Sequence, residues 1–224
     1  MKIYGVPLSV HTRKVILAAR IKEIPHEVEV VIPVIPDNPP PNWREISPTG
    51  LIPAINDDGF VLADSTAILL YMERKRPQPA LLPSNDRDYG TALFLDSWAG
   101  STMFRGVILP IFQNQVVNPS IRKVACDNAA IEAALTKAAP EAFGYLESLK
   151  PEAFLAGGKL SIADLAVVSN LILFHYLGHR LDAARFPKLQ TYFRRHVGSA
   201  ALQSTLKDET PFAQQMGLDR SWIG

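Results

Sequence analysis

The stretch LIPAINDDGFVLADS, residues 51–65, decides how the first part of this chain folds. Two short apolar runs flank Asp57-Asp58-Gly59, and an Asp-Gly pair between such runs is a strong signal for a β-hairpin. Asp64 and Ser65 follow at once, and both residue types favour the first turn of a helix, which the apolar spacing extends to Lys75. The stretch therefore predicts two antiparallel strands followed directly by a helix.

The residues before this stretch predict two further strands with a helix between them. KIYGV (2–6) is a short apolar run that ends at glycine and proline, and HEVEVVI (26–32) alternates polar and β-branched residues. Between these runs, residues 9–21 place apolar side chains at helical spacing, and a proline-rich loop joins the second strand to the hairpin. We therefore expect residues 1–76 to form one α/β domain.

The residues after this stretch predict helices only. Prolines interrupt the segment 77–86, which we take as a linker, and residues 87–224 show no strand pattern. Apolar residues recur at helical spacing from Ile121 to Leu149, with a kink expected at Pro140. Ser161-Ile-Ala-Asp164 forms a capping box ahead of an almost wholly apolar helix. The predicted fold is an α/β domain followed by an all-α domain.

Composition excludes several classes of function. Lys plus Arg number 23 and Asp plus Glu number 22 among 224 residues, so the chain lacks the excess positive charge of a nucleic-acid-binding protein. The most apolar stretch, Leu165 to Phe174, is too short to cross a membrane, and no targeting segment is visible. The single cysteine, Cys126, forms no disulfide within the chain, and we expect it to be buried. We predict a cytoplasmic protein with neither a nucleic-acid nor a membrane partner.

The segment SVHTRKV, residues 9–15, raises a question about chemistry. It places the Ser9 hydroxyl at the start of a helix, with Arg13 and Lys14 one turn further on. Serine is a common helix cap, but the partial positive charge of a helix amino terminus also favours an anion or a thiolate. Both interpretations stay open on these residues alone. Arg13 and Lys14 are expected to be solvated surface charges.

Four segments in this order resemble the cytosolic glutathione transferases over essentially the whole chain. They are SVHTRKV (9–15), SPTGLIPAI (47–55), LADSTAI (62–68) and LAGGKLSIAD (155–164). The resemblance implies a thioredoxin-like amino-terminal domain, an all-α carboxyl-terminal domain, and glutathione held between them as co-substrate. It also implies a detoxifying homodimer.

The resemblance assigns roles to individual residues. Ser9 would stabilise the glutathione thiolate, which places the chain among the serine-type classes, since neither the Tyr nor the Cys pattern is present. Leu51 and Ile52, ahead of a cis Pro53, would contact the cysteinyl backbone of glutathione. Asp64 and Ser65 would hold its γ-glutamyl end, although the family prefers Glu at the first position.

Two parts of the predicted site are less complete. The family often has a basic residue or His in the loop before Leu51, to bind the glycyl carboxylate of glutathione, and here only Asn38, Asn42 and Arg44 could take that role. The pocket for a small electrophilic, hydrophobic co-substrate is predicted from four residues of suitable position: His11, Met103, Phe104 and Phe112.

We predict no metal. His175 and His179 stand four residues apart on one helix face, a spacing that can bind zinc, but no third ligand is evident.

These observations predict an enzyme that conjugates the glutathione thiolate to electrophilic hydrophobic compounds. Three alternatives share the fold: a protein that binds glutathione or an apolar ligand without turnover, a glutathione-dependent isomerase or dehalogenase, and a scaffold that has lost glutathione. Intact Ser9, Pro53 and Ser65 argue against the last of these.

Overall fold

The computed structural model describes residues 1–223, and the strands of its single sheet all lie in the first part of the chain. Strand β1 pairs in parallel with β2 and antiparallel with β3, and β3 pairs antiparallel with β4, in the order β2-β1-β3-β4. The strands are β1 (Lys2–Tyr4), β2 (Glu27–Glu29), β3 (Ala54–Asp57) and β4 (Phe60–Ala63). The hairpin predicted from Asp57-Asp58-Gly59 is confirmed.

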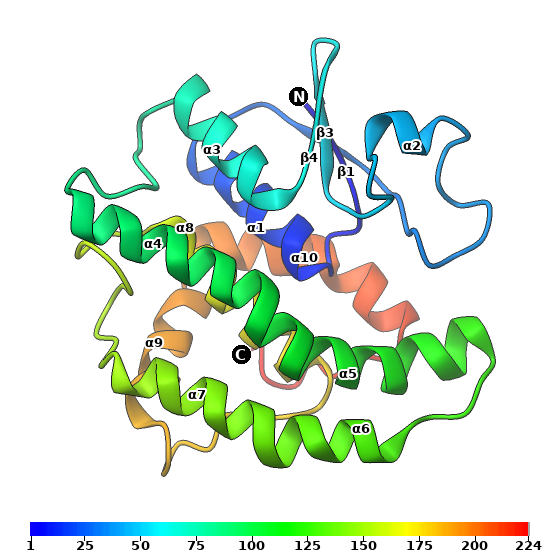
Figure 1. Ribbon diagram of the computed structural model, residues 1–224, viewed down its shortest axis with the longest axis vertical. Coiled ribbons are helices and arrows are strands. Elements are labelled where there is room, and N and C mark those ends of the chain that lie inside the picture. Colours follow the sequence, from blue (N-terminus) through cyan, green and yellow to red (C-terminus); the bar gives the residue numbers. More distant parts are fainter. Residues whose placement is uncertain (224) are drawn as a thin grey trace.

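Three helices accompany this sheet. Helices α1 (Val10–Ile21) and α3 (Ser65–Lys75) lie on one side of it, and α2 (Trp43–Ile46) lies on the other, against β3 and β4 (Figure 1). The predicted order of strands and helices is therefore confirmed. The short helix α2 was not predicted, because the prolines before it suggested a loop throughout.

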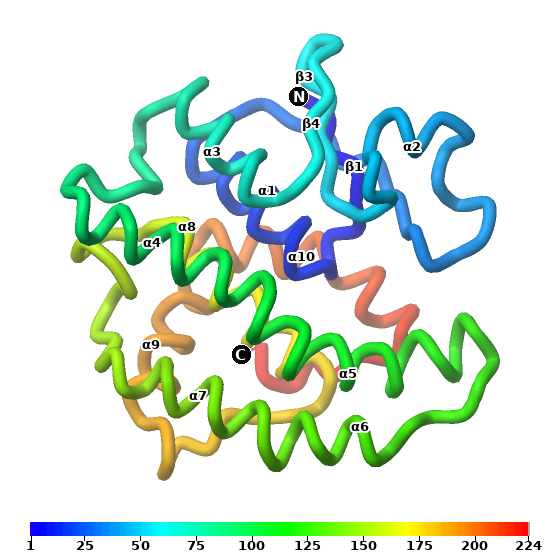
Figure 2. The backbone as a smooth tube through the Cα atoms, in the orientation of Figure 1, coloured from blue at the N-terminus to red at the C-terminus, as the bar shows by residue number. Residues whose placement is uncertain are grey.

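The rest of the described chain is helical (Figure 2). Residues 86–122 are helical without a break, alternating between α and π hydrogen-bond patterns. The helices are α4 (Asp86–Trp98), π-helix η1 (Ala99–Ile108), α5 (Leu109–Phe112), π-helix η2 (Gln113–Arg122), α6 (Asn128–Ala133), π-helix η3 (Ala134–Ala138), α7 (Ala139–Ser148), α8 (Ile162–Tyr176), α9 (Pro187–Val197) and α10 (Ala200–Gln215). The predicted α/β plus all-α fold is confirmed, whereas the exact domain limits stay a prediction.

The helical repeat predicted from Ile121 to Leu149 is wrong at its start. Lys123 takes a left-handed conformation (φ 57°) and ends η2, so the next helix begins only at Asn128. Val124, which fitted the repeat, is exposed. Pro140 is the second residue of α7, which follows η3 directly, so the helical hydrogen-bond pattern does change near this proline.

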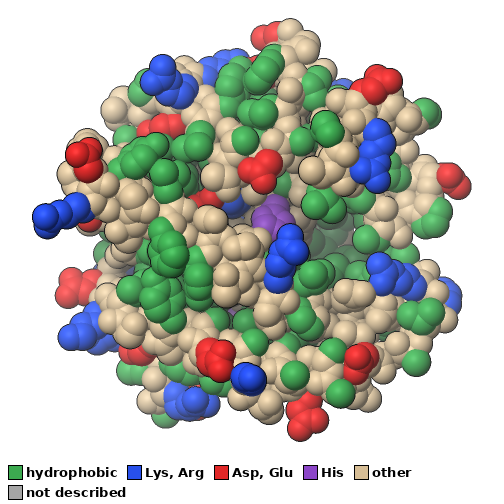
Figure 3. All heavy atoms as spheres, in the orientation of Figure 1, with side chains coloured by type: hydrophobic (Ala, Val, Ile, Leu, Met, Phe, Trp, Pro, Cys, Tyr) green, Lys and Arg blue, Asp and Glu red, His purple; other side chains and the backbone are tan. Residues whose placement is uncertain are grey.

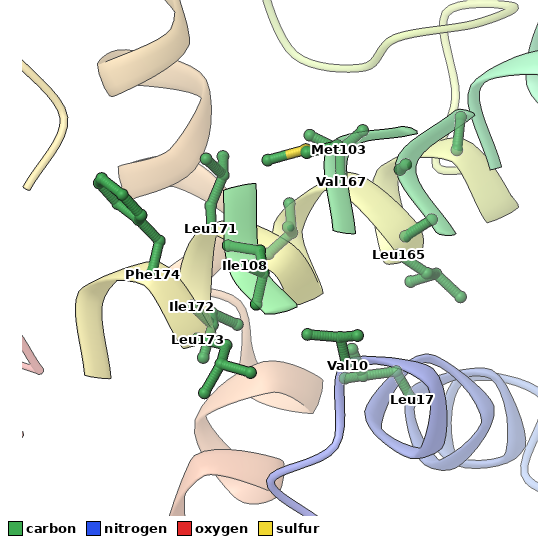
Figure 4. Close-up of a cluster of buried hydrophobic side chains, with 14 of the residues drawn as sticks. Val10, Leu17, Met103, Ile108, Leu165, Val167, Leu171, Ile172, Leu173 and Phe174 are labelled. Atoms are coloured by element: carbon green, nitrogen blue, oxygen red, sulfur yellow. The ribbon is translucent and has the colours of Figure 1, made fainter. Parts of the chain in front are cut away.

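The core is centred on α8, in which every residue is buried. A helix that is apolar on all sides needs partners all round, and α8 packs against α1, α4, η1 and α9. Figure 4 shows Val10 and Leu17 of α1 facing this cluster, in which Leu165 and Ile172 belong to α8. The contact between α1 and α8 thus fixes the α/β part against the helical part.

The capping box at the start of α8 is confirmed. Asp164 is 1% exposed, and its carboxylate accepts hydrogen bonds from the Ser161 N–H (2.8 Å) and the Ser161 hydroxyl (3.1 Å). It also accepts from the Leu155 N–H (2.9 Å) and the Tyr192 hydroxyl (2.9 Å). One buried carboxylate therefore fixes the helix start, the preceding loop and α9.

The predicted burial of Cys126 is wrong. This cysteine is exposed in the connection between η2 and α6, where its Sγ lies 3.3 Å from Asn128 Oδ1. Within residues 1–223, no helix is long and apolar enough to span a membrane.

Candidate active site

Ser9 is the amino-terminal cap of α1. Its Oγ accepts a hydrogen bond from the Thr12 N–H, and the long distance of 3.4 Å makes this a weak bond. Among the described residues the hydroxyl donates to no acceptor, and the side chain is only half-buried. The cap uses a lone pair of the oxygen, so the hydroxyl hydrogen can still be donated to another group. Capping and donation to a ligand are therefore compatible.

Ile52 offers a free segment of backbone beside the sheet. The Ile52–Pro53 peptide bond is cis, as the resemblance implied, and Pro53 is buried. In the part of the chain that the structure describes, neither the N–H nor the C=O of Ile52 has a hydrogen-bond partner. The neighbouring Leu51 uses both of its backbone groups internally, to Thr49 and Ser47, and its side chain is 64% exposed.

Asp64 and Ser65 form the start of α3. One carboxylate oxygen of Asp64 accepts from the Thr66 N–H (2.9 Å) and the Ala67 N–H (3.0 Å), and the second oxygen accepts from no donor in the described part of the chain. Asp64 itself has a φ of 77°, an uncommon value for a residue other than glycine. Ser65 is 6% exposed, and its hydroxyl makes no hydrogen bond within residues 1–223. A free carboxylate oxygen and a free hydroxyl at a helix amino terminus suit a group carrying both an ammonium and a carboxylate.

The sheet register brings these three segments together. Tyr4 pairs with Ala54, and Ala54 pairs with Ala63, so these residues form one row across the sheet. Ser9 follows β1, Ile52 precedes β3, and Asp64-Ser65 follows β4. All three therefore lie beyond the same end of the sheet, and this end faces the helical part (Figure 1).

Two aromatic side chains lie near the start of α1. Figure 3 shows a hollow in this face of the molecule with a histidine side chain at its edge. His11 packs edge-on against Phe104 of η1, with ring centroids 4.7 Å apart. Burial, then the positive charge of Lys14, lower the pKa of His11 to about 4, and the negative charge of Asp64 opposes this shift. His11 is therefore a neutral, amphipathic side chain at pH 7.

The remaining residues predicted for the co-substrate pocket differ in how far they are buried. Met103 is 0% exposed and lies in the core cluster with Val167 and Leu171 of α8, so its prediction as a pocket residue is wrong (Figure 4). Phe112 is half-buried at the end of α5, and its role stays a prediction. Of the four residues, the structure brings His11 and Phe104 into contact.

Lys14 is not a surface charge, which corrects the prediction. Its side chain is 2% exposed, and its Nζ donates to Asp96 Oδ1 of α4 (2.6 Å) and to the Thr66 hydroxyl (3.3 Å). The Thr66 hydroxyl in turn donates to Asp96 Oδ2 (2.5 Å). This network connects α1, α3 and α4, and its member Thr66 lies two residues after Asp64 in the first turn of α3.

Sequence reasoning missed Thr66 and Asp96. The available signal was a carboxylate next to Leu95 inside an apolar helical repeat, a position where a charge must find a partner. Arg13 was also predicted to be exposed, but its side chain is 0% exposed and pairs with Glu209 of α10.

The candidates for the glycyl carboxylate of glutathione are not equivalent. Asn38 Oδ1 accepts from the Ile32 N–H (2.6 Å) and so holds its own loop. Asn42 precedes α2, and within the described residues its side chain makes no capping bond to that helix. Arg44 is exposed and donates from one nitrogen to the Pro48 carbonyl (3.1 Å). Arg44 thus retains free donors.

His175 and His179 serve packing and hydrogen bonding. His175 is buried, its Nδ1 lies 2.9 Å from the Leu171 carbonyl oxygen, and its ring stacks on Phe193 at 4.4 Å. His179 Nε2 lies 3.2 Å from Gln115 Nε2. Within residues 1–223, no group of three or more His, Cys, Asp or Glu residues is placed to hold a metal ion.

Two family profiles match the chain. Residues 3–80 match the amino-terminal domain of glutathione S-transferase, and residues 128–195 match its carboxyl-terminal domain. The chain belongs to the glutathione transferase family. The prediction of a glutathione transferase made from four short segments is thereby confirmed at the level of the family.

Individual proteins agree with this assignment. Human glutathione S-transferase theta-1 is 28% identical over 207 residues, covering 87% of this chain and 81% of its own. The FtsZ-localized protein A of Caulobacter vibrioides is 25% identical over 214 residues, covering 93% and 92%. The solved structure of human glutathione S-transferase T1-1, in its apo form, has a TM-score of 0.83 at 24% identity and covers 96% and 90% of the two chains, which shows the transferase fold.

Proposed function

We propose that this chain is a serine-type glutathione transferase that conjugates glutathione to electrophilic hydrophobic compounds. The observation that carries the proposal is the Ser9 hydroxyl at the start of α1, which lies beyond the same end of the sheet as the Ile52 backbone and the Ser65 hydroxyl. Within residues 1–223 none of these groups donates to a protein acceptor. These groups match the sulfur, the cysteinyl backbone and the γ-glutamyl carboxylate of glutathione in chemistry.

The Ser9 hydroxyl would act on the ionisation of the thiol. A free thiol has a pKa of about 8.5, so only a few per cent is thiolate at pH 7. A hydrogen bond to a charged group contributes about 1.5–3 kcal/mol, which lowers a pKa by roughly one to two units. The partial positive charge at the start of α1 acts in the same direction. Together these effects make the nucleophilic thiolate the main form near neutral pH.

The thiolate would attack an electrophilic carbon of the co-substrate. The sulfur lone pair forms the new C–S bond, and the electron pair of the broken bond leaves with the departing group or moves onto the conjugated acceptor. Phe104 and the neutral ring of His11 would form an apolar wall next to the start of α1. Such a wall suits a hydrophobic co-substrate and strengthens electrostatic interactions by reducing contact with water.

Relatives support this proposal and one alternative. Human theta-1 is named a glutathione S-transferase, and a theta-class enzyme from Xanthomonas axonopodis pv. citri, with a TM-score of 0.76 at 24% identity over 91% of this chain and 95% of its own, is described with glutathione bound. The Caulobacter relative carries a name that refers to FtsZ instead. A protein of this fold whose role is not conjugation, such as one that only binds glutathione, is the second candidate.

The test is a titration of glutathione bound to the wild-type protein. The thiolate absorbs in the ultraviolet, so its absorbance in the binary complex, followed against pH, gives the pKa of the bound thiol. We expect a value at least one unit below about 8.5, together with conjugation of at least one compound in a panel of electrophiles. Binding with an unshifted thiol and no conjugation would favour the second candidate.

We propose a homodimer in the cytoplasm on the basis of the family alone. Sedimentation equilibrium over a range of protein concentrations measures the mass in solution against the 24.7 kDa of one chain.

Ser65→Ala should weaken glutathione binding about five- to thirtyfold, because the charged γ-glutamyl carboxylate loses a hydrogen-bond donor. Asp64→Asn should act likewise through the ammonium group, and also weaken the cap of α3. Calorimetry measures both affinities. Asp58→Asn, at the exposed hairpin turn, is a control for a charge change away from the site. Unchanged affinity in both site variants would place the γ-glutamyl end elsewhere.

His11 should make stability depend on pH. Its pKa in the folded protein, about 4, lies below its ordinary value of 6.5. Between these values the unfolded chain binds a proton that the folded protein does not, so the stability contributed by neutral His11 is present above pH 6.5 and is lost toward pH 4.

We expect the wild type to lose about 1–2 kcal/mol more than His11→Gln as pH falls from 6.5 to 4, a value reduced because solvent screens a ring that is only partly buried. Urea unfolding of both proteins across this pH range measures the difference. If the free energy of unfolding changed with pH in the same way for the wild type and His11→Gln, then His11 would be as solvated in the folded protein as in the unfolded chain.

A further inference from the structure

Arg13 connects the first helix of the chain to the last long one. Its Nε donates to Glu209 Oε1 (2.6 Å) and its Nη2 to Glu209 Oε2 (3.0 Å), which is a two-point ion pair between α1 and α10. Both side chains are 0% exposed. The aromatic ring of Tyr176 lies beneath the guanidinium, 5.9 Å from its centre. The pair is thus shielded from water and has a fixed geometry.

The same guanidinium also reaches the backbone next to Ser9. Its Nη1 donates to the Ser169 carbonyl of α8 (2.7 Å), and its Nη2 donates to the Leu8 carbonyl (3.2 Å). The Leu8 carbonyl and the Ser9 N–H belong to one planar peptide group. That N–H donates to the Val6 carbonyl (2.9 Å), so the peptide group is held at both of its polar atoms.

A third contact fixes the other side of Ser9. The Arg13 N–H donates to the Ser9 carbonyl (2.8 Å), which begins the hydrogen-bond ladder of α1. The backbone therefore holds Ser9 on both sides, and Arg13 supplies a donor on each of them. By contrast, the only side-chain bond of Ser9 within residues 1–223 is the weak one from the Thr12 N–H. The position of its hydroxyl thus depends mainly on the backbone.

We propose that Arg13 is a positioning residue for Ser9, and that Glu209 on α10 sets the orientation of the Arg13 guanidinium. The inference rests on the proposed function of Ser9. Without the Leu8 contact the Leu8–Ser9 peptide group has one anchor less, and the hydroxyl no longer stays aimed at the bound sulfur. A displacement of about 1 Å in a reacting geometry can lower a rate a hundredfold. Through Glu209 and Arg13, helix α10 thus helps to hold Ser9 in place beside the glutathione sulfur.

Two variants separate positioning from stability. Arg13→Lys keeps a cation for Glu209, but a single ammonium lacks the planar fork that reaches Glu209, Ser169 and Leu8 at once. Arg13→Met with Glu209→Leu removes both charges together, and buried ion pairs replaced by apolar residues of similar size usually leave a protein folded. Both variants leave the Leu8 carbonyl without the guanidinium.

We expect both variants to bind glutathione within about twofold of the wild type, since the γ-glutamyl and cysteinyl contacts lie elsewhere. The turnover number at neutral pH should fall about tenfold, and the pKa of the bound thiol should rise by roughly one unit, so that part of the rate returns at higher pH. A purely structural role would lower the melting temperature without moving the thiol pKa. That result, or a wild-type thiol pKa in Arg13→Lys, would overturn the proposal.

Two controls match these variants. Asp208→Asn disrupts the more exposed pair with Arg20, which joins the same two helices without touching Leu8. Lys22→Met with Glu73→Leu removes a pair at the carboxyl end of α1, in which Lys22 is buried and its Nζ also donates to two carbonyls, those of Arg76 (2.9 Å) and Pro79 (2.8 Å). Both controls should leave the thiol pKa unchanged. A shift in either would mean that any loosening of α1 moves Ser9, which overturns the specific role of Arg13.

A double-mutant cycle with Ser9→Ala tests the positioning role of Arg13 separately from the proposed function of Ser9. If Arg13 acts through Ser9, adding Arg13→Lys to Ser9→Ala should change the thiol pKa and the turnover number little further. Additive losses would overturn the positioning role while leaving Ser9 in place. Wild-type values in Ser9→Ala alone would overturn the proposed function, and the positioning role with it.

Discussion

Asp164→Ala is expected to lower the free energy of unfolding by about 3–5 kcal/mol. The carboxylate accepts four hydrogen bonds, from the backbone of Leu155 and Ser161 and from the hydroxyls of Ser161 and Tyr192. Each buried donor left without a partner costs about 1–3 kcal/mol, although relaxation of the surroundings recovers part of the sum. Loss of a cap alone costs typically about 1 kcal/mol. Urea unfolding of the purified variant measures the change.

Tyr192→Phe is the matched control, because it removes one donor to the same carboxylate and keeps the aromatic ring. It should cost about 1 kcal/mol. In both variants the folded fraction should bind glutathione as the wild type does, since Asp164 lies in the helical core and not at the end of the sheet. An Asp164→Ala protein of unchanged stability that fails to bind glutathione would make this aspartate a residue of the site.

Local signals in the sequence were sufficient for most of the fold. The Asp58-Gly59 turn fixes the hairpin, and the capping residues fix the starts of α3 and α8. Each of these features depends on residues within a few positions of one another, which a sequence shows directly. The order of the strands in the sheet follows from the family resemblance, because no local pattern determines which strands pair.

Long-range contacts explain what the sequence did not reveal. Arg13 and Glu209 are 196 positions apart, and Lys14 and Asp96 are 82 apart. Charged side chains are mostly exposed, so without knowledge of their partners the sensible prediction for Arg13 and Lys14 was a solvated surface. Their burial follows from the position of α1, which packs against α3, α8 and α10 at once.

The residues predicted for the co-substrate pocket show a second limit of sequence reasoning. Met103 and Phe104 are adjacent and both suit an apolar pocket, yet Met103 is fully buried in the core and Phe104 contacts His11. The direction of a side chain on a helix depends on the helical phase relative to its neighbours. That phase changes where η1 adopts π hydrogen bonding, and the sequence carries no clear signal for such a change.

Ser9→Ala is expected to lower the turnover number at neutral pH ten- to a hundredfold while leaving glutathione binding nearly intact. The methyl group of alanine cannot donate to the sulfur, so the pKa of the bound thiol should rise toward about 8.5. Part of the rate should return as the pH rises, because more of the thiol then ionises without help. Ultraviolet titration of the binary complex and the pH profile of turnover measure these effects independently.

Ser65→Ala provides the comparison that makes this result specific. It should weaken affinity for glutathione and leave the pKa of the bound thiol close to that of the wild type, which is the opposite pattern. The stability of Ser9→Ala should fall by only about 0.5–1 kcal/mol, because the cap bond that it removes is long, at 3.4 Å. If Ser9→Ala instead shows the wild-type thiol pKa and turnover together with this small loss of stability, the hydroxyl of Ser9 is a helix cap and nothing more. The hydroxyl hydrogen, which has no acceptor within residues 1–223, would then donate to a group other than sulfur.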